Sequence, residues 1–344
     1  MTSATLTAQA VADLVGGRLL GQGAASIGGV AALDRAGPGT LSFLASARYL
    51  SQFRSSRAGA VLLREEHAGE AEGPPTRIVV RDPGRAILLV IERLFPAPPV
   101  SWVVDSTARI GEGTTFAGDV SIGPHAVVGR HVRLGARCRV GPGAIIEDGV
   151  VIGDDSDIGA HAICHRGARL GQRVRLKAGA VIGADGFGFL PDRDGLNAIP
   201  HVGGCILEDD VHIGSNSCVD RGSIDYTVIG SGTKIDNLVH VAHNCRIGRG
   251  CLLMAGVGLA GSARVGDGVI LAGQVGVGDH VTIGDRARVG GQAGVTGDVA
   301  PGTDVSGYPA RAHREFLRGQ AALYRVARII DDLESLVTKR GHRG

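Results

Sequence analysis

Aromatic side chains are scarce in this 344-residue chain, at 3% of the sequence, whereas glycine occurs 56 times. This composition does not suit an aromatic globular core and favours a solenoid filled by Ile, Val, Leu and Ala. No apolar run is long enough to span a membrane, and the N-terminal segment lacks the basic and apolar regions of a signal peptide. We therefore expect a cytoplasmic protein without a transmembrane segment.

The chain also lacks a strong net charge, paired cysteine motifs and a serine nucleophile motif. A net charge of +2 provides no overall field that would attract nucleic acid, so we expect no such partner. None of the six cysteines forms a CxxC pair, and we expect reduced core cysteines in a cytosolic protein. Without a GxSxG motif or a reactive-cysteine context, a covalent acyl-enzyme is not favoured.

A six-residue repeat extends from about Val104 to Ala300. An aliphatic residue opens each hexad and is usually followed by Gly, Ala, Asp or Glu, as in Ile110-Gly111. Three hexads form one triangular coil of a parallel β-helix, in which the aliphatic residues stack inward about 4.8 Å apart. The period excludes an α-helix, and collagen would need glycine at every third position. The regular stretches contain 29 hexads, which predicts nearly ten coils.

Residues 1–100 follow a different pattern, which predicts a small α/β domain. The expected elements are a helix at 7–15 after a Thr7 cap, strands at 41–44, 59–63 and 77–80, and an amphipathic helix at 83–95. The proline-rich segment 96–99 then forms a stiff linker into the solenoid.

Two further segments depart from the repeat. An insert between Ile182 and Leu207 is long enough to indicate a functional loop, although a lid without ligand contacts is an alternative. From Ala310 to Thr338, apolar residues recur at helical spacing. The part at 311–328 carries five Arg and one acidic residue. This segment predicts either a solvated helix face that packs on symmetry mates or a landing site for an acidic protein.

Three histidines of the repeat are candidates for chemistry. His243 is third in its hexad and should point away from the core, close to His240. His280 follows His243 by two coils plus one residue, which is about 10 Å along the axis. A flat solenoid face cannot enclose a substrate, so we expect an oligomer with sites between subunits. The histidines are consistent with ordinary surface residues, with a metal site between subunits, or with a general base for acyl transfer.

Four stretches of the sequence, taken together, indicate one family among the hexapeptide-repeat proteins. They are Leu41-Ser42-Phe43 with Tyr49, Asp185–Phe189 with Ile199-Pro200, Asp220–Gly230, and Ile235–Asn244. Over essentially its whole length the chain resembles the UDP-3-O-(3-hydroxyacyl)glucosamine N-acyltransferases of the lipid A pathway. The resemblance implies a mainly β, left-handed parallel β-helix that is catalytic at 101–308. It also implies a uridine-binding α/β domain at 1–100, C-terminal helices at 309–344 that contact a carrier protein, and a homotrimer.

The implied reaction moves a (3R)-3-hydroxyacyl group from acyl carrier protein to the 2-amino group of UDP-3-O-(3-hydroxyacyl)glucosamine, without a metal or cofactor. The implied roles are catalysis by His243 and His280, oxyanion binding by the Gly261 N–H, and substrate binding by Phe43, Ser46, Tyr49 and Asp236. A neutral imidazole suits removal of a proton from the attacking amine. A basic helix suits an acidic carrier protein.

Two positions depart from the family pattern. Ser46 stands where Asn is common and has a shorter reach, and His240 stands where Gln is common. The small residues of 290–295 predict room for a longer acyl chain if they line its channel. Three alternatives remain: an O-acyltransferase on UDP-N-acetylglucosamine, which should lack the N-terminal domain, a trimeric hexapeptide-repeat metalloenzyme, and a solenoid without catalysis.

Overall fold

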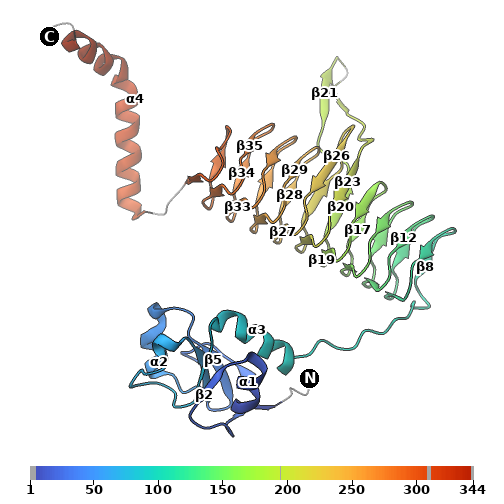
Figure 1. Ribbon diagram of the computed structural model, residues 1–344. Helices are drawn as coiled ribbons and strands as arrows, with labels where there is room; N and C mark the ends of the chain where they lie inside the picture. The colour runs from blue at the N-terminus through green and yellow to red at the C-terminus, as the bar shows by residue number, and fades with distance from the viewer. Residues whose placement is uncertain (1–4, 194, 308–310, 342–344) are drawn as a thin grey trace. The chain divides into compact units, whose positions relative to one another are not determined.

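A computed structural model describes residues 5–193, 195–307 and 311–341, which form two compact units (Figure 1). One unit covers residues 1–100, and the other covers residues 101–344. Among the described residues, no helix is both long and apolar enough to cross a bilayer.

The first unit is built on a five-stranded mixed sheet. Its strands lie in the order β2 (Arg18–Leu20), β7 (Arg77–Val79), β6 (Ala60–Leu63), β5 (Thr40–Phe43) and β4 (Gly29–Val30), and only β2 is antiparallel to its neighbour. Helices α1 (Ala8–Val15) and α3 (Pro83–Leu94) share a core with Leu62 on one face. On the other face, Phe53 of α2 (Leu50–Ser55) shares a core with Val61. Both faces of β6 are therefore buried.

The predicted helices and strands of this unit are confirmed to within about one residue at most ends. The Thr7 side chain accepts a hydrogen bond from the Ala10 N–H at 3.1 Å, and Gly16 closes α1 in the left-handed conformation. The sequence did not predict α2, β2, β4 or the small antiparallel pair β1 (Leu6–Thr7) and β3 (Ser26–Ile27). These elements are too short for a periodic pattern to develop.

Among the described residues, the second unit contains three parallel sheets of ten, ten and nine strands. They include every predicted hexad except the one that Val104 opens, which forms an isolated bridge, and they add one strand beyond Val295. The first sheet extends from β10 (Val120–Ile122) to β38 (Asp304–Val305), the second from β8 (Arg109–Ile110) to β37 (Gly294–Val295), and the third from β9 (Thr115–Phe116) to β35 (Thr282–Ile283). Neighbouring strands of a sheet are one coil apart, so that Val120 pairs with Cys138. The left-handed parallel β-helix predicted from the sequence is confirmed.

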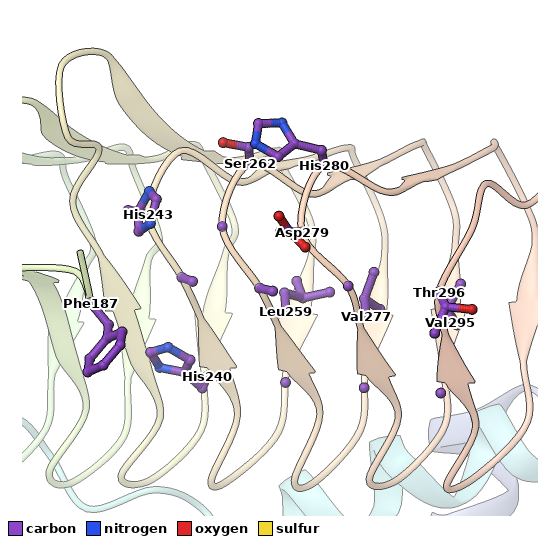
Figure 2. A pocket seen from close by; sticks show the side chains of 17 residues that line it. Phe187, His240, His243, Leu259, Ser262, Val277, Asp279, His280, Val295 and Thr296 are labelled. Carbon is purple, nitrogen blue, oxygen red and sulfur yellow. The ribbon is translucent and has the colours of Figure 1, made fainter. Parts of the chain in front are cut away.

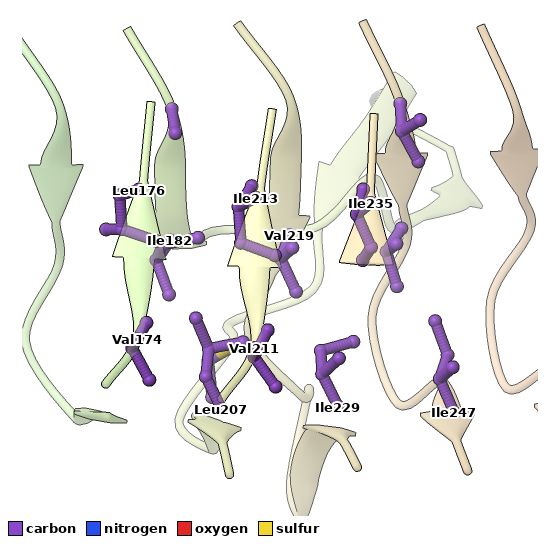
Figure 3. Close-up of a cluster of buried hydrophobic side chains, with 14 of the residues drawn as sticks. Val174, Leu176, Ile182, Leu207, Val211, Ile213, Val219, Ile229, Ile235 and Ile247 are labelled. Carbon is purple, nitrogen blue, oxygen red and sulfur yellow. The ribbon is translucent and has the colours of Figure 1, made fainter. Parts of the chain in front are cut away.

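Aliphatic columns fill the coil from end to end. Figure 3 shows Leu176, Ile213 and Ile235 stacked on successive strands, and each is at most 4% exposed. Small polar residues in the core bond to the backbone, as when the Thr233 hydroxyl donates to the Gly248 carbonyl at 2.8 Å. All six cysteines are free, as predicted, and all except Cys218 are buried. The repeat thus supplies a continuous apolar core in which buried hydroxyls such as that of Thr233 bond to the backbone.

Two irregularities of the coil meet at one place. The predicted insert is confirmed as a hairpin of β21 (Phe189–Asp192) and β22 (Gly195–Ala198), which projects from the coil between β20 (Val181–Ala184) and β23 (Gly204–Leu207). The repeat also slips by four residues after β25 (Cys218–Asp220), forming a loop at 221–225. The Val202 N–H donates to the Ser223 carbonyl at 2.8 Å. The base of the insert is therefore held against the slip loop.

The C-terminal segment forms one helix, α4 (His313–Gly341). Its predicted start at residue 310, and the predicted boundary between residues 308 and 309, lie outside the described residues. Apolar side chains on α4 are exposed in the single chain, for example Leu323 at 61% and Ile330 at 42%. Arg311 forms an ion pair with Glu315 at 3.7 Å. The helix therefore combines a basic segment with uncovered apolar residues.

Candidate active site

A groove of about 790 Å³ runs along the outer side of the second sheet (Figure 2). It crosses β28 (His240–Val241), β31 (Gly258–Leu259), β34 (Gly276–Val277) and β37 (Gly294–Val295). The outward residue of each of the last three strands is glycine, in direct register with His240. A Cβ atom at any of these glycines would meet no other atom within 4 Å. The absence of side chains there leaves an open trough in the surface.

His243 lies at one end of this groove, at the corner that follows β28. Its Nδ1 atom is 3.0 Å from the Asn244 side-chain oxygen. The same oxygen accepts the Ser223 backbone N–H at 3.0 Å and the Ser223 hydroxyl at 2.9 Å. An atom that accepts from a backbone N–H must be the amide oxygen, so Nδ1 of a neutral His243 carries the proton. Nε2 is then the basic nitrogen.

The position of Asn244 depends on the slip in the repeat. Asn244 has a left-handed backbone with φ of 61°, a conformation that Asn tolerates better than most residues. Its N–H donates to the Thr227 hydroxyl at 2.9 Å, and its side chain binds Ser223 in the slip loop. The slip loop at 221–225 therefore provides, through Ser223, the donors that orient Asn244 and, through it, the His243 ring.

Gly261 lies one coil beyond His243, directly under the imidazole ring. A Cβ atom here would be 2.8 Å from His243 Cε1 and 2.9 Å from Nε2, so the ring requires glycine. Within residues 5–193, 195–307 and 311–341, no backbone carbonyl accepts the Gly261 N–H. Pro124 and Pro142, which have no N–H, occupy the same place in their hexads. The corner geometry thus leaves the N–H of Gly261, the residue against the His243 ring, without a backbone acceptor in the described part of the chain.

His280 lines the same groove but holds a different place in the repeat. It is the fourth residue of its hexad, with a left-handed backbone, whereas His243 is the third. Its N–H donates to the Gly261 carbonyl at 3.0 Å, and its side chain is exposed. The structure therefore brings His243, Gly261 and His280 to one groove along successive coils.

His201 is a site residue that the sequence analysis missed. Its ring meets the His243 ring edge to face, with the centroids 5.3 Å apart. Its Nδ1 bonds to the Ile199 carbonyl at 2.9 Å, so Nδ1 carries the proton and Nε2 is an acceptor. That Nε2 is buried and has no partner in the part of the chain that the structure describes. The only signal for His201 in the sequence is its place at the end of the insert.

Asp220 is a second residue that the sequence analysis did not single out. The residue is 3% exposed, and its carboxylate lies close to the Cys218 thiol and the His240 ring. Burial raises the pKa of the Asp220 carboxyl, while the nearby imidazoles of His240, His243 and His201 act in the opposite direction. A carboxylate therefore lies buried beneath the histidine cluster at the head of the groove.

Several residues proposed for substrate binding lie elsewhere. Asp236 lines a separate pocket of about 470 Å³ on the first sheet, together with the basic residues Lys177, His212 and Lys234. Of the small residues at 290–295, only Gly294 and Val295 line the groove. A single chain therefore does not bring Asp236 to His243.

The predicted uridine residues belong to the first unit. The Phe43 ring is 37% exposed, Ser46 is exposed, and Tyr49 packs partly against the core that contains Phe53. The Arg48 guanidinium lies 4.5 Å from the centroid of the Tyr49 ring. One face of Tyr49 is therefore covered by a cation, a contact that the sequence analysis did not foresee.

Comparison with known proteins gives close relatives over the full length. A relative from Syntrophotalea carbinolica named UDP-3-O-acylglucosamine N-acyltransferase is 46% identical and covers 97% of this chain and 99% of its own. A relative of the same name from Granulibacter bethesdensis is 43% identical over 93% of each chain. The chain belongs to the UDP-3-O-acylglucosamine N-acyltransferase family. It is therefore an acyltransferase of lipid A synthesis.

Family models agree with this membership. The model described as UDP-3-O-(3-hydroxymyristoyl) glucosamine N-acyltransferase, LpxD, matches residues 24–93. Hexapeptide models of bacterial transferases match 131–166 and 226–261, and a succinyl-transferase repeat matches 149–184. Among solved structures, the UDP-N-acetylglucosamine O-acyltransferase of Moraxella catarrhalis is 26% identical. It covers 70% of this chain and 93% of its own, with a TM-score of 0.45.

Proposed function

We propose that this family member transfers a (3R)-3-hydroxyacyl group from acyl carrier protein to the 2-amino group of UDP-3-O-(3-hydroxyacyl)glucosamine, with His243 as general base. The observation that carries the proposal is the orientation of His243. Asn244 accepts a hydrogen bond from the Nδ1–H group, which leaves a basic Nε2 close to Gly261, whose N–H has no backbone acceptor among the described residues. A base and an oxyanion donor at neighbouring positions are what direct attack of an amine on a thioester requires.

The chemical step follows from these two groups. The substrate amine attacks the thioester carbonyl while its proton moves to Nε2 of His243. The carbonyl oxygen becomes an oxyanion that the Gly261 N–H stabilises. As the carbon–sulfur bond breaks, the imidazolium returns the proton to the departing thiolate. The products are an amide and the free thiol of the carrier, and His243 is again neutral.

The glycine trough gives the acyl chain a place to lie. Gly258, Gly276 and Gly294 present a flat floor, and successive strands are about 4.8 Å apart along the axis. An extended hydrocarbon chain that starts at His243 would follow this line. The trough is open to one side in a single chain, so a neighbouring subunit of a homotrimer would provide the second wall.

The remaining substrate contacts fit the same assembly. Phe43, Tyr49 and Ser46 would hold the uracil ring, because Phe43 and Ser46 are exposed and Tyr49 is half-buried. Asp236 lies on a different face of the coil from His243, so it would act across a subunit boundary or with a different part of the substrate. The basic segment of α4 would bind the acidic carrier protein. His280 would line the path of the substrate.

A transfer assay with hydroxyacyl carrier protein and UDP-3-O-acylglucosamine tests the proposal. We expect His243→Ala to lose about a hundredfold or more of kcat, the range for a general base, while the matched surface variant His125→Ala keeps full activity. Size measurement of all three proteins would show whether they assemble alike. Turnover that survives in His243→Ala would exclude it as the base. Preferred turnover of UDP-N-acetylglucosamine would favour the O-acyltransferase alternative.

A further inference from the structure

Three potential metal ligands lie on the outer side of the second sheet, at the end of the groove that His240 lines. In β25, Val219 points into the core, so Cys218 and Asp220 point to the opposite side. In the next coil, His240 of β28 pairs directly with Cys218, and Val241 is the inward residue. The alternation of the two strands therefore places a thiol, a carboxylate and an imidazole side by side on one face of the sheet.

The distances between these groups suit one small cation. The Cys218 sulfur is 3.4 Å from Asp220 Oδ1, and His240 Nε2 is 3.6 Å from Oδ2. The three ligand atoms lie within 4.8 Å of one another. A tetrahedral zinc ion, with bonds of about 2.0 Å to nitrogen or oxygen and 2.3 Å to sulfur, separates its ligands by about 3.5 Å. Small side-chain rotations would bring all three atoms to that spacing.

The burial of Asp220 indicates that the carboxylate needs a positive partner. The side chain is almost inaccessible to solvent, and among the described residues its hydrogen-bond partner is the weakly polar Cys218 thiol. The Arg221 guanidinium is directed instead to the Gly183 carbonyl and Asp185. A buried carboxylate is stable when it is protonated, ion-paired or bound to a metal. The His240 side chain is 52% exposed, and an imidazole is a positive partner for the carboxylate only when it is protonated.

We propose that Cys218, Asp220 and His240 bind one divalent transition-metal ion of the zinc class. Thiolate, imidazole and carboxylate together select zinc or cobalt over magnesium or calcium, which prefer oxygen ligands alone. Three protein ligands leave a fourth position for water. Of the three ligands, His240 also lines the groove, as does Phe187 (Figure 2). Binding replaces the thiol proton, which leaves to solvent as the metal–sulfur bond forms.

Cobalt(II) titration of the full-length untagged protein tests this site directly. We expect one equivalent per chain, with a thiolate-to-cobalt charge-transfer band in the near ultraviolet and the visible bands of tetrahedral cobalt. Addition of zinc should remove both sets of bands by displacement. Cys218→Ser should abolish the charge-transfer band, and His240→Gln should weaken binding by at least about tenfold. The exposed His313→Gln on α4 is the matched control and should bind as the parent does.

Two outcomes would overturn the proposal. One is the absence of a charge-transfer band in the folded parent protein at saturating cobalt, which would leave Asp220 protonated or paired with His240. The other is a band that persists in Cys218→Ser, which would place the metal elsewhere. Thermal melting of Cys218→Ser checks that this near-isosteric variant is folded. The spectra do not depend on turnover, so failure of the metal site and failure of the acyl-transfer proposal are distinguishable.

Discussion

At His243, one amide oxygen determines which ring nitrogen is basic. Asn244 accepts three hydrogen bonds, from His243 Nδ1 and from the backbone and hydroxyl of Ser223. Removal of this acceptor would allow the imidazole to rotate and to place its proton on either nitrogen. The role of Asn244 is therefore that of a positioning residue.

The variant Asn244→Gly tests this role, because glycine keeps the left-handed backbone without strain. We expect kcat to fall by about tenfold or more while KM changes little, since the loss affects the base and not substrate contacts. Asn244→Asp should restore most of the activity, because a carboxylate accepts the same hydrogen bonds. Steady-state kinetics at several pH values would measure both. Equal activity in the glycine variant would contradict the assignment.

The resemblance to the family predicted His243, Gly261 and His280, and the structure brings these three to one groove. Neither His201 nor Asp220 was predicted. Their proximity to His243 depends on how the insert and the slip loop fold onto the coil. A periodic pattern in the sequence does not predict such contacts. Arg48 over Tyr49 was missed for a similar reason, because adjacent residues in a short helical turn show no pattern. Local repeats thus predict strands, but not the contacts between irregular segments.

At the scale of the element, the register of the strands controls the trough. Gly276 lies on β34, two coils beyond His240, with open space where its Cβ would be. Because none of the described residues crowds this position, a side chain can be added there without disturbing the fold.

Gly276→Val should therefore shorten the acyl chain that the enzyme accepts. We expect kcat/KM for long donors to fall by about tenfold or more, with short donors little affected, since two methyl groups would occupy the trough. Gly294→Val, one coil farther along, is the matched variant and should exclude only the longest chains. A donor series of increasing length measures both. A uniform loss for every donor would show that the trough does not hold the chain.

Basic side chains that stack on neighbouring strands of the first sheet predict that the stability of the fold depends on pH. His212 of β24 (His212–Ile213) pairs in register with Arg175 and Lys234, and Lys177 is close by. Burial and then the positive charge of Lys234 lower the pKa of His212, and Asp210 opposes this only in part. Like charges in direct register are unfavourable.

Because the folded protein takes up this proton less readily than the unfolded chain, His212 stabilises the fold above about pH 6.5. That contribution is lost as the pH falls through the lowered pKa. We expect His212→Gln to flatten the decline of the melting temperature between about pH 6.5 and 5. Lys234→Gln should flatten it less, since it removes only the second cause. Parallel declines in all three proteins would contradict this prediction.

At the same scale, the sequence predicted the coil far better than the first unit's small strands. Each hexad places one aliphatic residue inward, and the signal is repeated 29 times along the chain. Strands such as β2 and β4 contain two or three residues, which are too few to show alternation. Helices α1 and α3 were predicted because Thr7, Gly16 and Pro83 mark their ends.

At the scale of the whole molecule, charge on α4 should determine how readily the carrier protein binds. Arg325→Glu with Arg328→Glu reverses two charges on the exposed helix. We expect KM for the acyl carrier to rise by about three- to tenfold at low ionic strength and the effect to shrink in salt, with kcat little changed. The control Arg109→Glu with Arg133→Glu makes the same change in charge at the other end of the coil. Equal effects of both pairs would contradict a specific landing site.

The stacking of the coils also determines the order in which the parts of the β-helix unfold. Each coil contacts only its neighbours, so unfolding proceeds inward from the two ends, and amide hydrogen exchange should form a gradient along the axis. In the second sheet, six strands precede β28 and three follow it. The far end of the trough, at β37, is thus the last strand of its sheet, whereas His243 is well inside. Local unfolding of the final coil would therefore reduce the selectivity between acyl chains of different length before it displaced His243.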